Sequence, residues 1–119
     1  MANRLGIGQV SVANTNLDGT GTLADIFSAG SAGSLISRVE VRAAGNTTNG
    51  MIRLFVYDGT NTRLWQEITI TGTTPSATTQ AASGNVTPSP SLPLKNGWTL
   101  KASTHNAETF NVFAYGFDN

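Results

Sequence analysis

Alternation of apolar and polar residues with a period of two is the feature that most restricts the fold of this chain. It recurs along the whole sequence, whereas a helical period is almost absent. In an extended chain Leu35, Val39 and Val41 fall on one face. Arg38 and Glu40 fall on the opposite face. Such alternation is typical of strands with one face in a core, so it predicts an all-β protein.

About eight short strands are expected, with turn signals roughly every 8–12 residues. They lie within 1–12, 22–28, 35–43, 51–57, 62–71, 78–86, 98–103 and 109–117. Residues 1–12 are either the first strand or an N-terminal arm, and the Pro-rich segment 87–93 is expected to be an extended loop. A chain of 119 residues forms one core. We therefore predict a single domain over residues 1–119, a jelly-roll-like antiparallel β-sandwich.

Charged residues are scarce and balanced. They make up 12% of the chain, with seven basic and seven acidic side chains, and there is no cysteine. Without a basic field nothing attracts phosphate backbones, so we expect no nucleic-acid binding. No stretch approaches the roughly 20 apolar residues of a membrane span, and no disulfide or thiolate chemistry is expected. A neutral surface of this kind is poorly protected against self-association.

The sequence contains no recognisable set of catalytic or metal-binding residues. The single histidine, His105, lies in a polar stretch that is expected to be a loop between two strands. Asp18-Gly19 and Asp58-Gly59 indicate turns and lack the several converging oxygens of a calcium site. Neither a Gly-x-Ser-x-Gly elbow nor a complete dinucleotide motif occurs. We therefore expect no enzymatic activity, cofactor or metal ion.

A hairpin is predicted for 51–57 and 62–71, with the three-residue loop Gly59-Thr60-Asn61 and a left-handed Asn61. The expected pairs are Ile52–Ile68, Arg53–Glu67, Leu54–Gln66, Phe55–Trp65 and Val56–Leu64. Aromatic and opposite-charge pairs across a hairpin each contribute about 0.2–1 kcal/mol, which favours this register. It directs Ile52, Leu54, Val56, Ile68 and Ile70 into the core.

The opposite face of that hairpin is a candidate interaction surface. It would carry Arg53, Phe55, Tyr57, Arg63 and Trp65, residue types that are enriched at interface hot spots. Two other interpretations stay open at this point. The chain's own segment 87–93 could cover the aromatic residues, or they could form a platform on which a sugar stacks.

Residues 2–12 are a second candidate contact. Leu5, Ile7 and Val10 alternate with the small residues Gly6 and Gly8. Such a segment could add a strand to the sheet edge of a neighbouring subunit. It could equally be the first strand of its own sandwich.

Three groups of strand and turn motifs carry a resemblance to a known family: 36–43 with its Gly-Asn-Thr-Thr loop, 50–61, and 97–104 with 107–112. They resemble small virion structural proteins of tailed bacteriophages, over roughly residues 20–117. The resemblance implies a jelly-roll sandwich, assembly as a homo-oligomer and attachment to a phage particle. It carries over no catalytic residue.

A capsid decoration (cement) protein fits this resemblance best. Cement proteins of this size are typically trimers at local three-fold points, so the implied partners are the chain itself and the major capsid protein or another virion protein. The protein would be made in the host cytoplasm and located on the capsid surface. A small tail or head-fibre component is the first alternative, and a carbohydrate-binding module is the second. The low, balanced charge indicates docking through apolar and backbone contacts.

Overall fold

The computed structural model describes residues 2–119, which form nine β-strands and no helix. The strands are β1 (Ala2–Val10), β2 (Ala24–Ser28), β3 (Ser34–Ala43), β4 (Gly50–Tyr57), β5 (Thr62–Ile70), β6 (Ser83–Val86), β7 (Leu92–Leu94), β8 (Thr99–Thr104) and β9 (Phe110–Asp118). The predicted all-β class is therefore confirmed. Among the described residues, no helix is long and apolar enough to cross a membrane.

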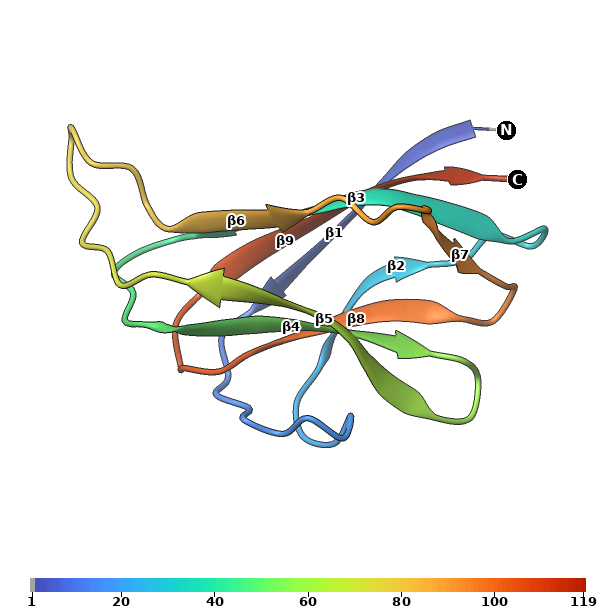
Figure 1. Cartoon of the computed structure of the whole chain (residues 1–119), viewed down its shortest axis with the longest axis horizontal. Coiled ribbons are helices and arrows are strands. Elements are labelled where there is room, and N and C mark those ends of the chain that lie inside the picture. The colour runs from blue at the N-terminus through green and yellow to red at the C-terminus, as the bar shows by residue number, and fades with distance from the viewer. Residues whose placement is uncertain (1) are drawn as a thin grey trace.

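Two antiparallel sheets lie face to face as a sandwich (Figure 1). Sheet A has the order β1-β9-β3-β6, and the short strand β7 also pairs with β3. Sheet B has the order β2-β8-β4-β5. The chain changes sheet at most connections, and only the β4–β5 and β6–β7 connections stay within one sheet. The predicted two-sheet sandwich is thus confirmed.

The core lies between the two sheets. Its fully buried centre includes Val39 and Val41 from β3, and Ile52 and Leu54 from β4. Alternation therefore places residues as the sequence predicts, with one exception on β3. A bulge between Ile36 and Arg38 reverses the alternation, so that Ile36 enters the core in place of Leu35.

Two glycines let the sheets approach closely at β1. A Cβ added at Gly6 would overlap the carbonyl oxygen of Ile26 on β2, and one added at Gly8 would overlap the Ile26 side chain. At both glycines the Cβ would point from the sheet toward the core, and there it meets β2. Strand β2 therefore lies beneath the inner face of β1. The small residues of this segment are therefore explained by contact between the two layers.

The segment 11–23 runs across the outer face of sheet B, below β8 and β4 in Figure 1. Asn14 organises it: its backbone N–H donates to the carbonyl of Thr104 on β8 at 2.8 Å. The buried Asn14 amide donates to the carbonyl oxygens of Thr20 and Thr22 at 3.0 and 2.9 Å. Gly19, which has a φ of 87°, lies against the backbone of Thr62 at the start of β5. This segment therefore crosses sheet B from β8 to β5.

The β4–β5 hairpin follows the predicted register only in part. The pairs Ile52–Ile68, Arg53–Glu67 and Leu54–Gln66 are present as expected. The loop, however, has four residues, 58–61, and a bulge then shifts the register so that Phe55 pairs with Leu64 and Val56 with Arg63. The predicted pairs Phe55–Trp65 and Val56–Leu64 are therefore wrong.

The hairpin loop explains this difference. The Asp58 carboxylate accepts the backbone N–H groups of Thr60 and Asn61 at 3.0 and 2.8 Å, so Asp58 belongs to the turn. The left-handed residue is Gly59, with a φ of 93°, and Asn61 does not have a positive φ. The loop has one residue more than predicted, and the bulge adds one extra residue to β5. The two changes cancel, so the pairs from Leu54–Gln66 onward keep the predicted register.

Candidate functional site

An apolar strip lies on the outer face of sheet A, along β1 and β9. Leu5 is 45% exposed and Ile7 61% exposed, and they pair with Tyr115 and Phe113 of β9. Tyr115 is 41% exposed. We define the β1–β9 surface as Leu5, Ile7, Phe113, Tyr115 and Phe117. Because large apolar residues on a sheet face seldom stay uncovered, this strip is the strongest candidate contact in the described chain.

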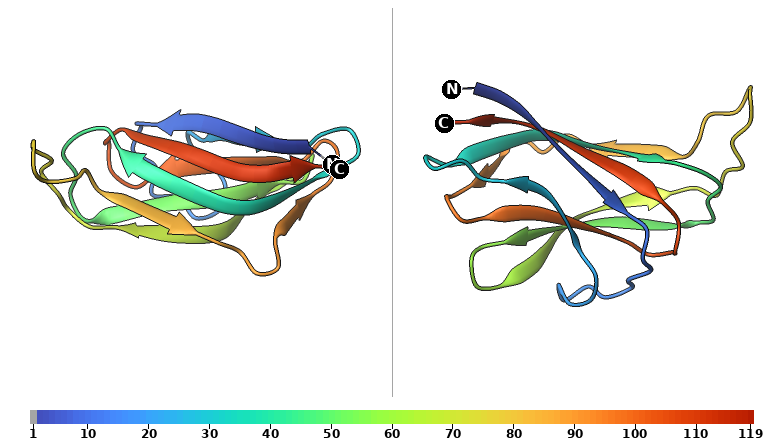
Figure 2. Two further views of the ribbon diagram at one scale, coloured as in Figure 1. Left: turned by 90° about the horizontal axis from the view of Figure 1, so that it is seen from above. Right: turned by 180° about the vertical axis from the view of Figure 1, so that it is seen from behind.

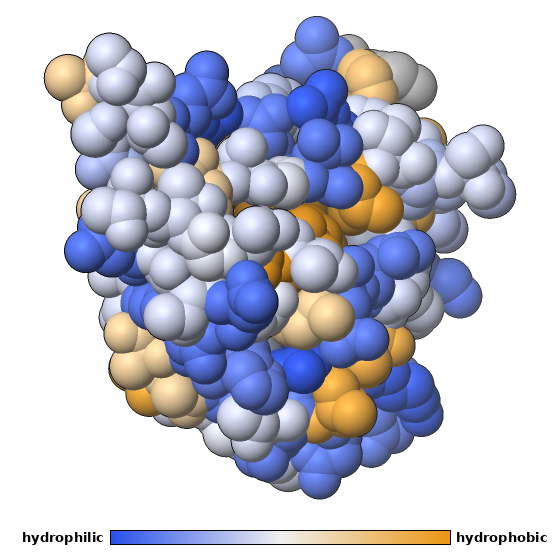
Figure 3. All heavy atoms as spheres, turned by 60° about the vertical axis from the view of Figure 1, so that its left-hand side comes forward, coloured by the Kyte–Doolittle hydropathy of each residue, from blue (hydrophilic) through white to orange (hydrophobic). Residues whose placement is uncertain are grey.

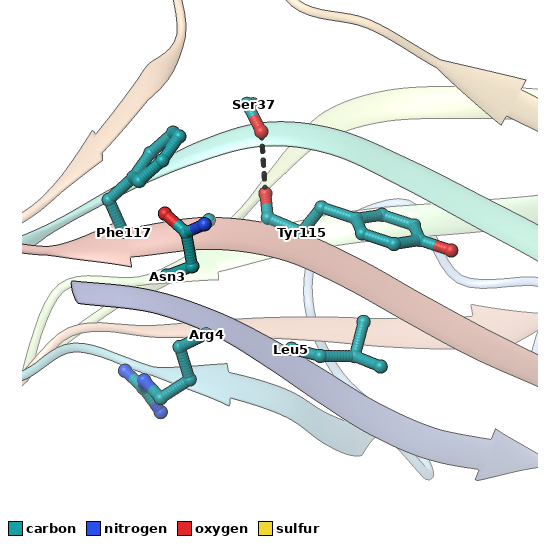
Figure 4. Close-up of a pocket in the computed structure, with 7 residues that line it drawn as sticks. Asn3, Arg4, Leu5, Ser37, Tyr115 and Phe117 are labelled. Atoms are coloured by element: carbon teal, nitrogen blue, oxygen red, sulfur yellow. Dashed lines mark hydrogen bonds between the residues drawn. The ribbon is translucent and has the colours of Figure 1, made fainter.

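A hollow of about 400 Å³ adjoins the strip at the N-terminal end of β1 (Figure 4). Asn3, Leu5, Tyr115 and Phe117 line it, with Ser37 at its far side. Ser37 is the bulged residue of β3, and its hydroxyl donates to the carbonyl oxygen of Tyr115 at 3.1 Å. The hollow is therefore a shallow, mostly apolar feature of the same surface.

The sequence analysis identified Leu5 and Ile7 but missed the three aromatic residues of β9. A signal for them exists in the sequence. Phe113, Tyr115 and Phe117 alternate with Val112 and Ala114, so the last strand is apolar on both faces. One apolar face fills the core, and the second is left for a contact outside this chain.

Charges on the molecule are neutralised locally. Five ion pairs take up ten of the fourteen charged side chains. They are Arg4–Asp118, Arg38–Glu40, Arg53–Glu67, Arg63–Asp58 and Lys101–Asp25. Among residues 2–119, such close pairing leaves few unpaired charges from which a patch of one sign could form to dock a charged partner.

Three aspartates have lowered pKa values because of these local contacts. The Ser34 hydroxyl and then the Arg4 guanidinium hold the pKa of Asp118 below its ordinary value. Backbone N–H groups of Asn61 and Thr60, followed by Arg63, lower the pKa of Asp58. The hydroxyl of Thr20 lowers the pKa of Asp18. Asp18 is exposed, Asp58 and Asp118 are partly buried, and each shift is explained by structural hydrogen bonds.

The hairpin residues of the predicted interface do not form one surface. They are Arg53, Phe55, Tyr57, Arg63 and Trp65. Phe55 is wholly buried on the outer face of β4, where the segment 11–23 crosses sheet B, so it is not accessible to a partner. Arg53 is buried beside it and donates to Glu67 at 2.9 Å. Tyr57 is half-buried, and its hydroxyl donates to the carbonyl oxygen of Gly59.

Trp65 lies on the opposite side of sheet B from Phe55. The bulge at this position turns its side chain toward the core, where it is half-buried next to the Pro-rich segment 88–93. Arg63 is exposed and paired with Asp58 at 2.6 Å. The predicted shared face of Phe55 and Trp65 is therefore wrong. The Pro-rich segment lies beside Trp65 across a hollow and leaves the ring partly exposed.

Val10 is also removed from the predicted contact residues. It is buried at the end of β1 and belongs to the core. Residues 2–10 form the first strand of the chain's own sandwich, in which Leu5 and Ile7 alone among the three predicted residues face outward. The segment is therefore a strand of its own domain. It also keeps an exposed apolar side, at Leu5 and Ile7, that a neighbouring subunit could contact.

A second hollow lies where β4 begins and β5 ends. Met51, Arg53, Ile70 and His105 are among its lining residues, and Arg53 Nη1 lies 3.1 Å from His105 Nδ1. In Figure 3, which brings the left-hand end of Figure 1 forward, hydrophilic and neutral residues cover most of the face, and hydrophobic ones lie at the bottom of a hollow. Within residues 2–119 no three His, Cys, Asp or Glu side chains gather as a metal site.

The chain matches no protein-family model and no curated protein.

Proposed function

We propose that the protein is a structural component of a bacteriophage virion, a capsid decoration protein that binds the shell as a homo-oligomer and stabilises it. A homotrimer is the form that the sequence resemblance implies. The partner is the major capsid protein or another virion protein, and the place of action is the capsid surface. The β1–β9 surface is the single observation that carries this proposal, because it offers an exposed apolar docking face on the outside of the sandwich.

The strand order supports the jelly-roll part of the expectation. Sheet A, with β1, β9, β3 and β6, faces sheet B, with β2, β8, β4 and β5. Two interlocked four-stranded sheets of this kind are how a jelly roll is built, and β7 is an additional short strand. Jelly rolls are frequent in viral capsid proteins, which agrees with the proposed role.

Local neutralisation of charge supports an apolar mode of docking. Most charged side chains already have a partner within the chain, whereas Leu5, Ile7 and Tyr115 are exposed. Burial of apolar surface contributes about 25 cal/mol per Å², and it is far less sensitive to salt than docking between charged patches. The protein would thus bridge neighbouring shell subunits through apolar and backbone contacts.

The test is binding of the purified protein to undecorated shells between low and moderate salt. We expect saturable binding that changes little with salt, and density of this size on the shell by electron microscopy. Tyr115→Ser should weaken binding, while Leu17→Ser, which alters an apolar residue 54% exposed on the segment 11–23, should not. Density on the tail or a head fibre would favour the first alternative, and binding that collapses with salt would contradict the apolar mechanism.

Carbohydrate binding is the second candidate, and one observation favours it. The β5 bulge places Trp65 and Gln66 along the same hollow, together with Pro88 and Pro90. An aromatic ring beside an amide is the combination that a sugar ring requires, for stacking and for hydrogen bonds to its hydroxyls. Quenching or shift of tryptophan fluorescence by host surface glycans, lost in Trp65→Phe, would support this candidate, and an unchanged spectrum would remove it.

A further inference from the structure

We infer that two copies of this chain pair through β1, antiparallel and across a two-fold axis at Gly6, so that their A sheets join into one. The inference deepens the proposed homo-oligomer and rests on it, but it does not require shell binding. It is carried by three properties of β1: an open edge, the lack of any device that blocks pairing, and a self-complementary sequence.

The outer edge of β1 is open. Within residues 2–119, β1 forms its ladder with β9 alone, over nine consecutive residue pairs from Ala2–Asp118 to Val10–Phe110. Seen from above, β1 is the blue strand at the margin of its sheet (Figure 2, left). Because β2 lies beneath the inner face of β1 at Gly6 and Gly8, it does not cover this edge. A row of backbone N–H and C=O groups is thus left for another strand.

The three other sheet edges carry the features that prevent strand addition. β6 has only four residues and is soon followed by Pro88 and Pro90, and the neighbouring β7 contains Pro93. β2 is short and has an irregular register after Asp25. β5 carries a bulge and exposed charges. Prolines, bulges, charges and short strands are the usual protections of an edge.

β1 has none of these protections. It is regular over nine residues, and it contains no proline and no lysine. Its one charged side chain, Arg4, points away from Leu5 and Tyr115 (Figure 4). Arg4 donates to Asp118 and to the carbonyl oxygen of Ser28. Arg4 is therefore not free to repel an incoming strand.

The sequence of β1 matches itself when it is read antiparallel about Gly6. Leu5 then faces Ile7 of the second copy, and Asn3 faces Gln9. Apolar side chains meet apolar ones and amides meet amides, all on the outer face, while Gly6 meets Gly6 on the inner face. Directly opposed side chains on one face are the unit of sheet stabilisation, so this register is favoured.

Neighbouring registers lose that match. A centre at Ile7 would place Leu5 opposite Gln9, and a centre at Leu5 would place Asn3 opposite Ile7. Both oppose an apolar side chain to an amide. A shift by one residue would bring outward and inward side chains onto the same face, which a continuous sheet does not allow.

A pair of this kind is closed, because each copy uses the same edge. If nothing else associates, the contact gives two copies; if the implied trimer also forms, six copies close only when the two-fold axes cross the three-fold axis at right angles. The two β1–β9 surfaces would lie side by side on the joined sheet, giving one apolar face of twice the width.

The first test is the mass of the full-length protein in solution at tens of micromolar, by light scattering. We expect an even number of copies for the natural chain and half that mass for Ile7→Arg, in which two guanidinium groups would flank the shared edge. Leu17→Arg is the matched control, since it makes the same kind of change at a similar exposure outside β1, and its mass should equal that of the natural chain.

The second test fixes the register with introduced cysteines, which report without background because the chain has no cysteine. A mixture of Leu5→Cys and Ile7→Cys proteins should form disulfide-linked pairs of one copy of each, since these positions are directly opposed. Either variant alone should form far fewer, because its own copies are diagonal neighbours about 7–8 Å apart.

Three results would overturn the inference. They are a natural chain that is monomeric at these concentrations, an Ile7→Arg protein of unchanged mass, and efficient linking within a single cysteine variant. Since none of these measurements involves a shell, they are independent of the binding experiment above. A pair that forms but binds no shell would refute the decoration role and leave the β1 contact standing.

Discussion

Arg4 and Asp118 join the first and last strands at a point where both sheets meet. Arg4 donates from Nε and Nη2 to Oδ1 of Asp118 at 3.1 and 2.9 Å, and its guanidinium carbon lies 3.9 Å from the ring centre of Phe27 on β2. Asp118 also accepts the Ser34 hydroxyl at 2.7 Å. One side chain of β1 is thereby held by β9 and β2, and Asp118 connects it to the start of β3.

Replacing Arg4 by glutamine should loosen β1 without unfolding the domain. The substitution removes a bidentate ion pair and a cation–π contact, both partly exposed, so the loss of global stability should be small. Amide hydrogen exchange should speed up along 2–10 more than along β3. Arg38→Gln, which breaks the Arg38–Glu40 pair on the same sheet, should leave exchange in β1 unchanged. Equal effects of both variants would contradict the anchoring role.

Replacing Gly6 by alanine should destabilise the protein by about 1–3 kcal/mol, the usual cost of overpacking a core. The added methyl group would overlap the Ile26 carbonyl oxygen, a backbone atom that cannot rotate away. Denaturant unfolding measures this change. Gly45→Ala is the control, because a Cβ at Gly45 meets nothing within 4 Å, and it should change stability by less than about 0.5 kcal/mol.

Replacing Phe55 by alanine should cost about 3–5 kcal/mol, as for other fully buried aromatic residues. Tyr115→Ala should cost less than about 1 kcal/mol, since that ring is exposed on the β1–β9 surface. The two variants thus compare a buried outer face, at Phe55 on sheet B, with an exposed outer face, at Tyr115 on sheet A. A mild Phe55→Ala in thermal unfolding would show that the segment 11–23 does not bury the ring.

Replacing Asn14 by alanine should release the segment 11–23 from sheet B. It removes the two partly buried hydrogen bonds that the Asn14 amide donates to the carbonyl oxygens of Thr20 and Thr22, at a cost of about 0.5–1.5 kcal/mol each. Limited proteolysis should then cut within this segment at rates where the natural chain resists. Asn16→Ala, which removes an exposed contact with the Thr20 hydroxyl, should resist as the natural chain does.

Acid should remove the contribution of Asp118 to stability. Its pKa is lowered in the folded protein, so the group stabilises the fold at pH values above the ordinary 3.8 and loses this effect as the pH falls through the lowered value. The melting temperature of Asp118→Asn should lie below that of the natural chain near pH 6. The difference should shrink as the pH falls below 3.8, and a difference that stays constant would contradict this assignment.

Period-two alternation was enough to predict the fold class and most strands, because burial on one face dictates the side-chain pattern directly. It failed where a single extra residue reverses the alternation. The bulges near Ser37 and Trp65 exchange inner and outer faces, and nothing in the local sequence marks either one. The candidate surface on the hairpin depended on the second of these positions, which explains why Trp65 was assigned to the wrong face.

The second limit of the sequence-based prediction was that a segment distant in the sequence can cover a side chain. Phe55 is buried on the face of sheet B that residues 11–23 cross, and the path of this segment follows from hydrogen bonds of Asn14 rather than from any periodic pattern. The exposed side of β1 was predictable because the same alternation produces it. Whether a strand lies at an edge depends on strand order, which sequence alone leaves open.

The long connection between β5 and β6, residues 71–82, projects from the end of the molecule opposite both termini (Figures 1 and 2). Its tip, Ser76 to Thr79, is exposed and is held by short-range hydrogen bonds of its own. A foreign peptide inserted at this tip would point away from β1 and from the face proposed to contact the shell. The connection thus offers a place to display foreign peptides at the end of the molecule that is remote from both termini.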